Sequence, residues 1–307
     1  MRNLTPRTML SALALLAAFT VLSVSPALAG EFRMEKTLAL GPGGVLDLKT
    51  EGGRVIVRGT SRSDALVIVT SKDEDVEDHY DFIFEEHGDR AVVRAERRGS
   101  VLRRWFSWNE SPHFEVEVPR ITDLELRTSG GRISVEDIDG TADLHTSGGR
   151  ITLDSITGVV DASTSGGSIS AARLGDSAEL HTSGGSIAVE GVAGNLLAET
   201  SGGSIKISDA AGKVDADTSG GSITAYFTAG NAAGGSLESS GGRITAYIDA
   251  DAALDLDASS SGGGVSVDLP VTIRGKISRR SVRGTLNGGG ALLRLHTSGG
   301  GVSVRSL

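Results

Sequence analysis

The sequence predicts an all-β protein, a single-stranded parallel β-helix (β-solenoid) with 18-residue coils and a strand-rich N-terminal portion. A Thr-Ser-Gly-Gly motif recurs at a fixed spacing, apolar residues recur with the same period, and apolar and polar residues alternate within each unit. With 43 Gly residues and only 4% aromatic residues, the composition favours a thin core with many turns.

The motif keeps its spacing over much of the chain. Its 18-residue series begins at Thr128, Thr146, Thr164, Thr182, Thr200 and Thr218. Ser-Ser-Gly-Gly follows at Ser239 and Ser260, each 21 residues after the preceding motif, and Thr-Ser-Gly-Gly returns at Thr297. That last interval is 37 residues, which we interpret as two coils in succession. A related Thr-Glu-Gly-Gly begins at Thr50.

Apolar residues form columns with the same period. One column contains Ile133, Ile151, Ile169, Ile187, Ile205, Ile223, Ile244 and Val265. Others begin at Val135, Ile138, Ala142 and Leu144, and the spacing by two within a unit is typical of strands. Because one unit cannot bury its apolar face alone, identical strands are expected to stack and pair their backbone groups from coil to coil.

We interpret the glycine pair as a corner, where the backbone needs a positive φ or a close approach that a Cβ would prevent. The Thr hydroxyls are expected to bond along their column. A phosphate-binding loop requires Gly-Lys-Ser/Thr before a helix, whereas Gly212-Lys213 is followed by Val214. A calcium-binding β-roll carries Asp in the turn, whereas Arg or Ser follows the pair here, as at Arg150.

Residues 1–29 have the pattern of a cleaved signal peptide. Arg2 and Arg7 precede an apolar run, and Ala27-Leu28-Ala29 matches a cleavage site. The run is too short and interrupted for a membrane anchor, and no Cys follows it. We therefore expect an exported protein, periplasmic or extracellular and associated with the cell envelope, without a transmembrane segment after cleavage. With no Cys at all, it must fold without disulfides.

The rest of the chain is expected to form one continuous body. Residues 30–127 are predicted to hold N-terminal strands and the first coils, including a strand pair around His87-Gly88-Asp89 and a strand that ends at Pro119. Residues 128–307 are predicted to be the regular array with C-terminal capping coils. The stretch 97–108, rich in Arg and Trp, is interpreted as a cap on the open N-terminal end, or as a contact for lipid head groups, glycans or protein.

The charges exclude some partners and suggest others. Without the signal peptide, 28 basic residues face 39 acidic ones, which argues against nucleic acid. No acidic residue follows Asp268, whereas seven basic residues do. This positive end either discourages strand pairing between molecules or attaches the protein to a surface or to another copy, as in weak self-association through the solenoid ends.

One outward column could carry chemistry. It contains Asp143, Asp161, Glu179, Leu197 and Asp215, beside His145, Ser163, His181, Glu199 and Asp217. Stacked carboxylates could bind Ca²⁺, but Leu197 interrupts the column and the two His are two coils apart, so a solvated acidic face is the preferred interpretation. We therefore predict no catalytic, cofactor-binding or metal-binding residues and no cofactor.

The segment from Val116 to Gly140, VEVPRITDLELRTSGGRISVEDIDG, and the later Thr-Ser-Gly-Gly-Ser-Ile units resemble the bacterial putative-adhesin family of β-strand-repeat proteins, a domain of unknown function. The resemblance covers residues 38–307 and implies a right-handed parallel β-helix on an exported or envelope-facing chain. It supplies no site residues.

The predicted function is an exported, non-catalytic β-solenoid that serves as an adhesin-like or scaffold protein, with an unknown protein or glycan of the envelope as its partner. One alternative is a carbohydrate-active β-helix enzyme, a lyase or hydrolase, which would need paired carboxylates, usually on long loops. The other is a polymer-forming envelope protein.

Overall fold

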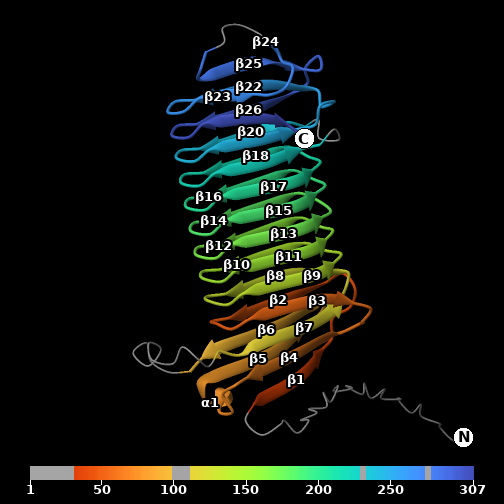
Figure 1. The fold of residues 1–307 in the computed structure, drawn as a ribbon. Coiled ribbons are helices and arrows are strands. Elements are labelled where there is room, and N and C mark those ends of the chain that lie inside the picture. The colour runs from red at the N-terminus through yellow and green to blue at the C-terminus, as the bar shows by residue number, and fades with distance from the viewer. Residues whose placement is uncertain (1–30, 99–110, 229–232, 274–277) are drawn as a thin grey trace, which may run out of the picture.

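The computed structural model describes residues 31–98, 111–228, 233–273 and 278–307. These residues form two long sheets that face each other along a rod (Figure 1). In spatial order, the 13 strands of sheet A are β1 (Phe32–Leu38), β4 (Ala65–Ser71), β7 (His113–Pro119), β3 (Val55–Thr60), β9 (Ile133–Ile138), β11 (Ile151–Ile156), β13 (Ile169–Leu174), β15 (Ile187–Val192), β17 (Ile205–Ala210), β19 (Ile223–Phe227), β21 (Ile244–Ile248), β27 (Val302–Ser306) and β23 (Val265–Val267).

Sheet B has 14 strands, and the short helix α1 (Val76–His79) precedes one of its edge strands. Their spatial order is β24 (Thr272–Ile273), β25 (Ser281–Leu286), β22 (Leu254–Ser260), β26 (Ala291–Thr297), β20 (Gly235–Ser239), β18 (Val214–Thr218), β16 (Leu196–Thr200), β14 (Ala178–Thr182), β12 (Val160–Thr164), β10 (Ala142–Thr146), β8 (Thr122–Thr128), β2 (Gly44–Thr50), β6 (Arg90–Arg97) and β5 (Tyr80–His87).

In the regular array, each 18-residue coil contributes one strand to each sheet. β10 and β11 form one coil, and β12 and β13 form the next. Parallel pairing aligns Ala142 with Val160 in sheet B and Ile151 with Ile169 in sheet A, so each residue lies beside the residue 18 positions away. The predicted all-β solenoid and its coil length are confirmed.

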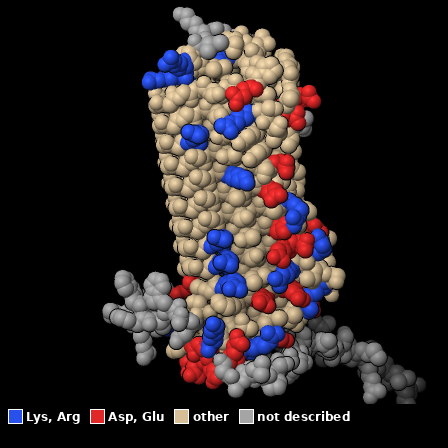
Figure 2. Space-filling view, viewed as in Figure 1, with Lys and Arg blue, Asp and Glu red and all other residues tan. Residues whose placement is uncertain are grey.

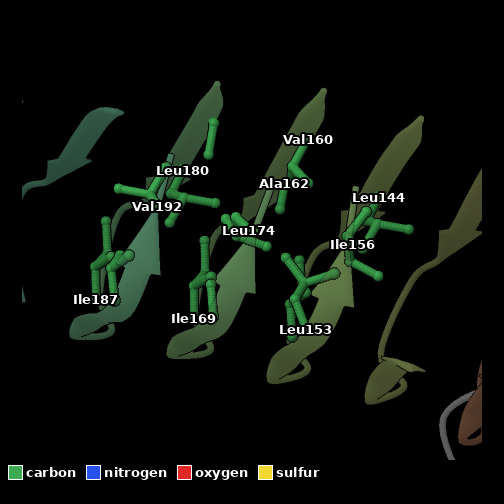
Figure 3. Packing of buried hydrophobic residues seen from close by; sticks show 14 of the residues in the cluster. Leu144, Leu153, Ile156, Val160, Ala162, Ile169, Leu174, Leu180, Ile187 and Val192 are labelled. Carbon is green, nitrogen blue, oxygen red and sulfur yellow. The ribbon is translucent and has the colours of Figure 1, made fainter. Parts of the chain in front are cut away.

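The predicted apolar columns point between the two sheets and form the core. Ile151, Ile169 and Ile187 from sheet A are each at most 1% exposed, as are Leu144 and Leu180 from sheet B. Figure 3 shows Leu144, Ile169, Leu180 and Ile187, among other side chains from successive coils, in the space between the two sheets. Each coil therefore gains its apolar burial from its neighbours, which is why the period in the sequence is strict.

The second glycine of each pair has a steric reason. A Cβ on Gly167 would lie 1.7 Å from the carbonyl oxygen of Gly149 in the preceding coil, and the same clash recurs along the column. A Cβ on Gly166 would meet nothing closer than 3.7 Å. Close stacking of corners requires the second glycine, and neither glycine of this pair has a positive φ.

The Thr of the motif joins neighbouring coils at this corner. The hydroxyl of Thr182 donates a hydrogen bond to the carbonyl of Gly167 in the preceding coil (2.7 Å) and accepts one from the backbone N–H of Gly185 in its own coil (3.3 Å). The same two bonds recur around Thr146, Thr164, Thr200 and Thr218. The hydroxyls thus bond glycine backbone, because the carbonyl of the adjacent corner lies within reach, and do not form a chain of Thr hydroxyls.

A second bend repeats in sheet A. Asp137, Ser155, Arg173, Gly191 and Asp209 are 18 residues apart and all have φ between 53° and 83°. In β11 this residue is left out of the strand pairing, so that Ile156 faces inward again. Four different residue types occupy the column, which explains why the sequence alone did not reveal it.

At the N-terminal end, antiparallel strands close both sheets. β4 and β1 pair antiparallel beyond β7 in sheet A, and β5 pairs antiparallel with β6 in sheet B. The strand pair around His87-Gly88-Asp89 and the strand ending at Pro119 are confirmed as β5–β6 and β7. Phe32, Phe82 and Phe114 form an aromatic cluster at this end. The cap predicted for 97–108 lies almost wholly outside the described residues, as does the signal peptide, 1–29.

The C-terminal end does not follow chain order. After β20 and β21 the chain skips one level to form β22 and β23, turns back through β24 and β25, and then fills the vacant level with β26 and β27. The interpretation of the 37-residue interval before Thr297 as two successive coils is therefore wrong. Thr297 lies between Ser239 and Ser260 in space, because β26 inserts between β20 and β22.

Candidate binding face

The predicted outward column lies on sheet B. Parallel pairing places Asp161 between Asp143 and Glu179, and Leu197 between Glu179 and Asp215. The neighbouring column is in register too, with the His145 ring 2.8 Å from the Ser163 hydroxyl and His181 3.5 Å from Glu199. Within the described ranges, no group of three His, Cys, Asp or Glu residues could hold a metal ion.

One carboxylate of this face has a perturbed pKa. Asp217 is exposed, but partial desolvation beside its neighbouring strands raises its pKa, and the carboxylates of Glu238 and Glu199 in those strands raise it further. In the folded protein Asp217 therefore binds its proton more tightly than in the unfolded chain. The free energy of unfolding consequently falls as the pH rises from the pKa of Asp217 in the unfolded chain through its raised pKa in the folded protein. At neutral pH the carboxylate is ionised, so the full destabilisation is present.

We expect Asp217→Asn to raise the free energy of unfolding at pH 7 by about 0.2–1 kcal/mol, the size of a repulsion between like charges on neighbouring strands. The thermal midpoint should rise slightly as a result. At about pH 3, below the ordinary Asp pKa, the difference should vanish. Glu190→Gln is the control, since Glu190 lies between Ala172 and Ser208 and faces no carboxylate in its column. Thermal melts from pH 3 to 8 measure this, and an Asn variant no more stable at pH 7 than the parent would contradict it.

The outer face of sheet A carries an aromatic pair that the sequence analysis missed. Tyr226 and Tyr247 align in β19 and β21, with ring centroids 4.7 Å apart and planes 8° apart. Residues 122–307 contain only three aromatic residues, and Phe227 is the buried one. The signal was present in the repeated Ile-Thr-Ala-Tyr of 223–226 and 244–247.

Beside this pair lies a shallow depression of about 400 Å³ over the last two coils of sheet A. Its polar lining consists of Arg243, Ser266, Asp268, Ser303 and Arg305. Arg305 aligns with Tyr247 in the neighbouring strand, so the depression continues the tyrosine column. Gly264 and Gly301 form part of its floor.

The guanidinium groups of this depression keep unused donors. Arg305 Nε donates to the Ser303 hydroxyl (3.2 Å), and the Ser266 hydroxyl donates to Asp268 (3.3 Å). Neither Arg243 nor Arg305 forms an ion pair with a carboxylate of the described residues. The site therefore offers planar cationic donors to a partner.

A second depression lies on sheet B, and some of its lining residues bond to one another. Arg283 Nε lies 3.1 Å from a carboxylate oxygen of Asp257, and the Ser259 hydroxyl lies 3.0 Å from the His296 ring. Of its other lining residues, Glu238 accepts a hydrogen bond from Ser236, and Arg294 forms no ion pair with a carboxylate of the described residues. The tyrosine pair makes sheet A the better candidate for binding.

Across the residues that the structure covers, no helix has the length and apolarity to cross a membrane. No curated protein matches the chain. Among solved structures, it is similar to a putative adhesin from Bacteroides fragilis, at 11% identity and a TM-score of 0.44, covering 89% of this chain and 97% of that one. A putative cell adhesion protein from Clostridium sporogenes matches at 10% identity and a TM-score of 0.29, covering 90% and 100%. A putative lipid binding protein from Parabacteroides distasonis matches at 10% identity and a TM-score of 0.33, covering 89% and 96%.

The family comparison covers most of the solenoid. A family model, Toastrack DUF4097, matches residues 45–305, from the second strand to the last. The resemblance predicted from the Thr-Ser-Gly-Gly units is thereby confirmed. The chain belongs to the Toastrack DUF4097 family, a domain family of unknown function.

Proposed function

We propose that this protein is an exported, adhesin-like β-solenoid of the bacterial envelope that binds a partner on the outer face of sheet A without transforming it. The observation that carries the proposal is the Tyr226–Tyr247 stack. In a chain with 4% aromatic residues, two of the three tyrosines lie together on an outward column, next to Arg305, which forms no ion pair with a described carboxylate. Tyr and Arg are the residues that interfaces favour most.

The arrangement suits binding better than catalysis. Glycoside hydrolysis requires two carboxyl groups about 5–10 Å apart, and Asp268 is the single carboxylate that lines the depression on sheet A. Continuous strand pairing from β3 to β23 makes that face a rigid support, which reduces the ordering cost of binding.

The tyrosine pair provides the test. We expect Tyr226→Ala/Tyr247→Ala to weaken binding of the labelled mature protein to isolated envelopes of the source bacterium by about tenfold or more, as loss of central aromatic anchors does. The fold should persist, because the two tyrosines are half-buried on the outer face and a cross-strand pair contributes only about 0.2–1 kcal/mol. Thr152→Ala/Ser170→Ala, on an outward column of the same sheet, is the control. Equal binding by the Tyr and control variants would refute the proposed face.

A second candidate function, head-to-tail assembly, is favoured by the charges of the two ends. The segment 73–89, which forms α1 and β5 at the N-terminal end, contains nine acidic residues and no Lys or Arg. At the opposite end Arg279, Arg280 and Arg283 lie in and beside β25. Figure 2 shows acidic side chains gathered at the first end and a basic group at the second. Two copies stacked end to end would bring the opposite charges together.

We expect the mature protein to associate in light-scattering measurements at low salt and to dissociate near 0.3 M salt, where charges more than about 6 Å apart are screened. Arg279→Glu/Arg280→Glu should abolish the association, whereas Arg132→Glu, at the first corner of the regular array and away from both ends of the rod, should not. A monomer at every salt concentration would contradict head-to-tail assembly.

A further inference from the structure

We infer that the depression at the C-terminal end of sheet A is a binding site for an anionic polysaccharide, with the acidic group held between Arg243 and Arg305 and the sugar chain continuing over Tyr247 and Tyr226. The inference rests on the proposed function, because it names the partner class of the same face. Its evidence is a cavity, two arginines that form no ion pair with a described carboxylate, and an aromatic column in register with one of them, Arg305.

Two glycines, Gly264 and Gly301, line the cavity at the position where earlier coils carry a side chain. In the seven regular corners the residue after the glycine pair is Arg or Ser, namely Arg132, Arg150, Ser168, Ser186, Ser204, Ser222 and Arg243. Gly264 and Gly301 replace that side chain in the last two levels of sheet A, where Val302 N–H donates to the Gly264 carbonyl. A Cβ on Gly264 would have its nearest neighbour at 3.5 Å, an ordinary contact, whereas one on Gly301 would lie 3.1 Å from the Gly264 carbonyl oxygen, and neither residue has a positive φ. Gly264 is therefore the glycine that the fold does not require.

The third glycine therefore leaves space where earlier coils present a side chain. Elsewhere in the corner, the second glycine is imposed by a backbone clash, as at Gly167. No such clash applies at Gly264. An open surface at that point is what a ligand would need.

The charges around this space select an anion. Arg243 approaches it from the corner of one coil and Arg305 from the end of the next strand, and both side chains are exposed and free of ion pairs with described carboxylates. Guanidinium groups bind carboxylate or sulfate oxygens in a planar, paired geometry. Asp268 and the hydroxyls of Ser266 and Ser303 supply the acceptors and donors that sugar hydroxyls require.

The tyrosines extend the site along the rod. Tyr226, Tyr247 and Arg305 occupy one outward column across three neighbouring strands, which are spaced about 4.8 Å apart. A ligand that contacted all three would run across the coils, parallel to the stacking direction. An extended polymer has this shape, whereas a single small ion would use the arginines alone.

Sheet B is expected to bind such a ligand weakly. Its outward column carries Asp143, Asp161 and Glu179, whose charges repel a polyanion, and Asp257 already pairs with Arg283 in its depression. Binding is therefore expected on one face of the rod.

The test is calorimetric titration of the mature full chain with polygalacturonate, dextran sulfate and neutral dextran. We expect the anionic polymers to bind and neutral dextran to bind at least about tenfold more weakly. Comparison of the two anionic polymers identifies carboxylate or sulfate as the preferred group. Arg243→Gln/Arg305→Gln should lose about tenfold or more in affinity, and Gly264→Ser, which refills the cavity, should also weaken binding.

The controls separate this inference from general electrostatics and from the proposed function. Arg150→Gln removes the same charge from the same corner position five coils away from Arg243 and should bind like the parent. Parent-like affinity in the double Arg variant, equal affinity for neutral dextran, or no binding of either anionic polymer would overturn the inference. Envelope binding that still depended on Tyr226 and Tyr247 would then leave the proposed function standing, with a different partner.

Discussion

Gly167→Ala is expected to disrupt the stack at one corner and lower the free energy of unfolding by about 3 kcal/mol or more. The added Cβ would lie 1.7 Å from the Gly149 carbonyl oxygen and 2.4 Å from its carbon, and both are backbone atoms of the neighbouring coil. Relief requires the two coils to move apart, which would break the parallel hydrogen bonds on either side. Thermal melts followed by circular dichroism measure the loss.

Gly166→Ala is the matched control for this prediction. The residue is adjacent in the same motif, and its added Cβ would meet nothing within 3.7 Å. The control should stay within about 0.5 kcal/mol of the parent, or gain slightly, because alanine reduces the freedom of the unfolded chain. Equal stability of the two alanine variants would show that the corners are not stacked as closely as described.

Thr182→Val is the second large effect, with an expected loss of about 1–3 kcal/mol. Thr182 is 0% exposed, and its hydroxyl satisfies the Gly167 carbonyl and the Gly185 N–H. Valine keeps the shape of the side chain and removes both bonds, so the loss reports unsatisfied backbone groups rather than a cavity. The measurement is the change in thermal midpoint.

Thr182→Ser retains the hydroxyl and serves as the comparison. Ser239 and Ser260 occupy the same column naturally, and their hydroxyls donate to the Gly221 and Gly300 carbonyls at 2.9 and 2.7 Å. The serine variant should therefore be more stable than the valine variant. The reverse order would mean that the methyl group, and not the hydrogen bonds, keeps threonine in this column.

The regular array could be predicted because one period governs strands, corners and core together. Ile151, Ile169 and Ile187 were assigned to one column from spacing alone, and the structure aligns them in sheet A. The outward carboxylates were placed in the same way, since a residue's side of the strand follows from period 2.

The arrangement of the C-terminal end could not be predicted, because there the spatial order of the strands departs from the chain order. The motif at Thr297 has the right residues, but nothing in its spacing shows that β26 enters between β20 and β22. The proposed binding face could not be predicted from the sequence for a related reason. Tyr247 and Arg305 are 58 residues apart and become neighbours only through that insertion.

The most direct test of the stacked-coil architecture is a set of distances between spin labels. The chain has no Cys, so pairs of introduced cysteines can be labelled without background. With one label at Ser134, partners at Thr224, Thr245, Ser303 and Ser266 lie five, six, seven and eight strand spacings away in sheet A. The account predicts distances that increase by about 4.8 Å per spacing, with Ser303 closer to Ser134 than Ser266 is, although it comes later in the chain. Distances that did not grow with coil number, or Ser266 closer than Ser303, would contradict it.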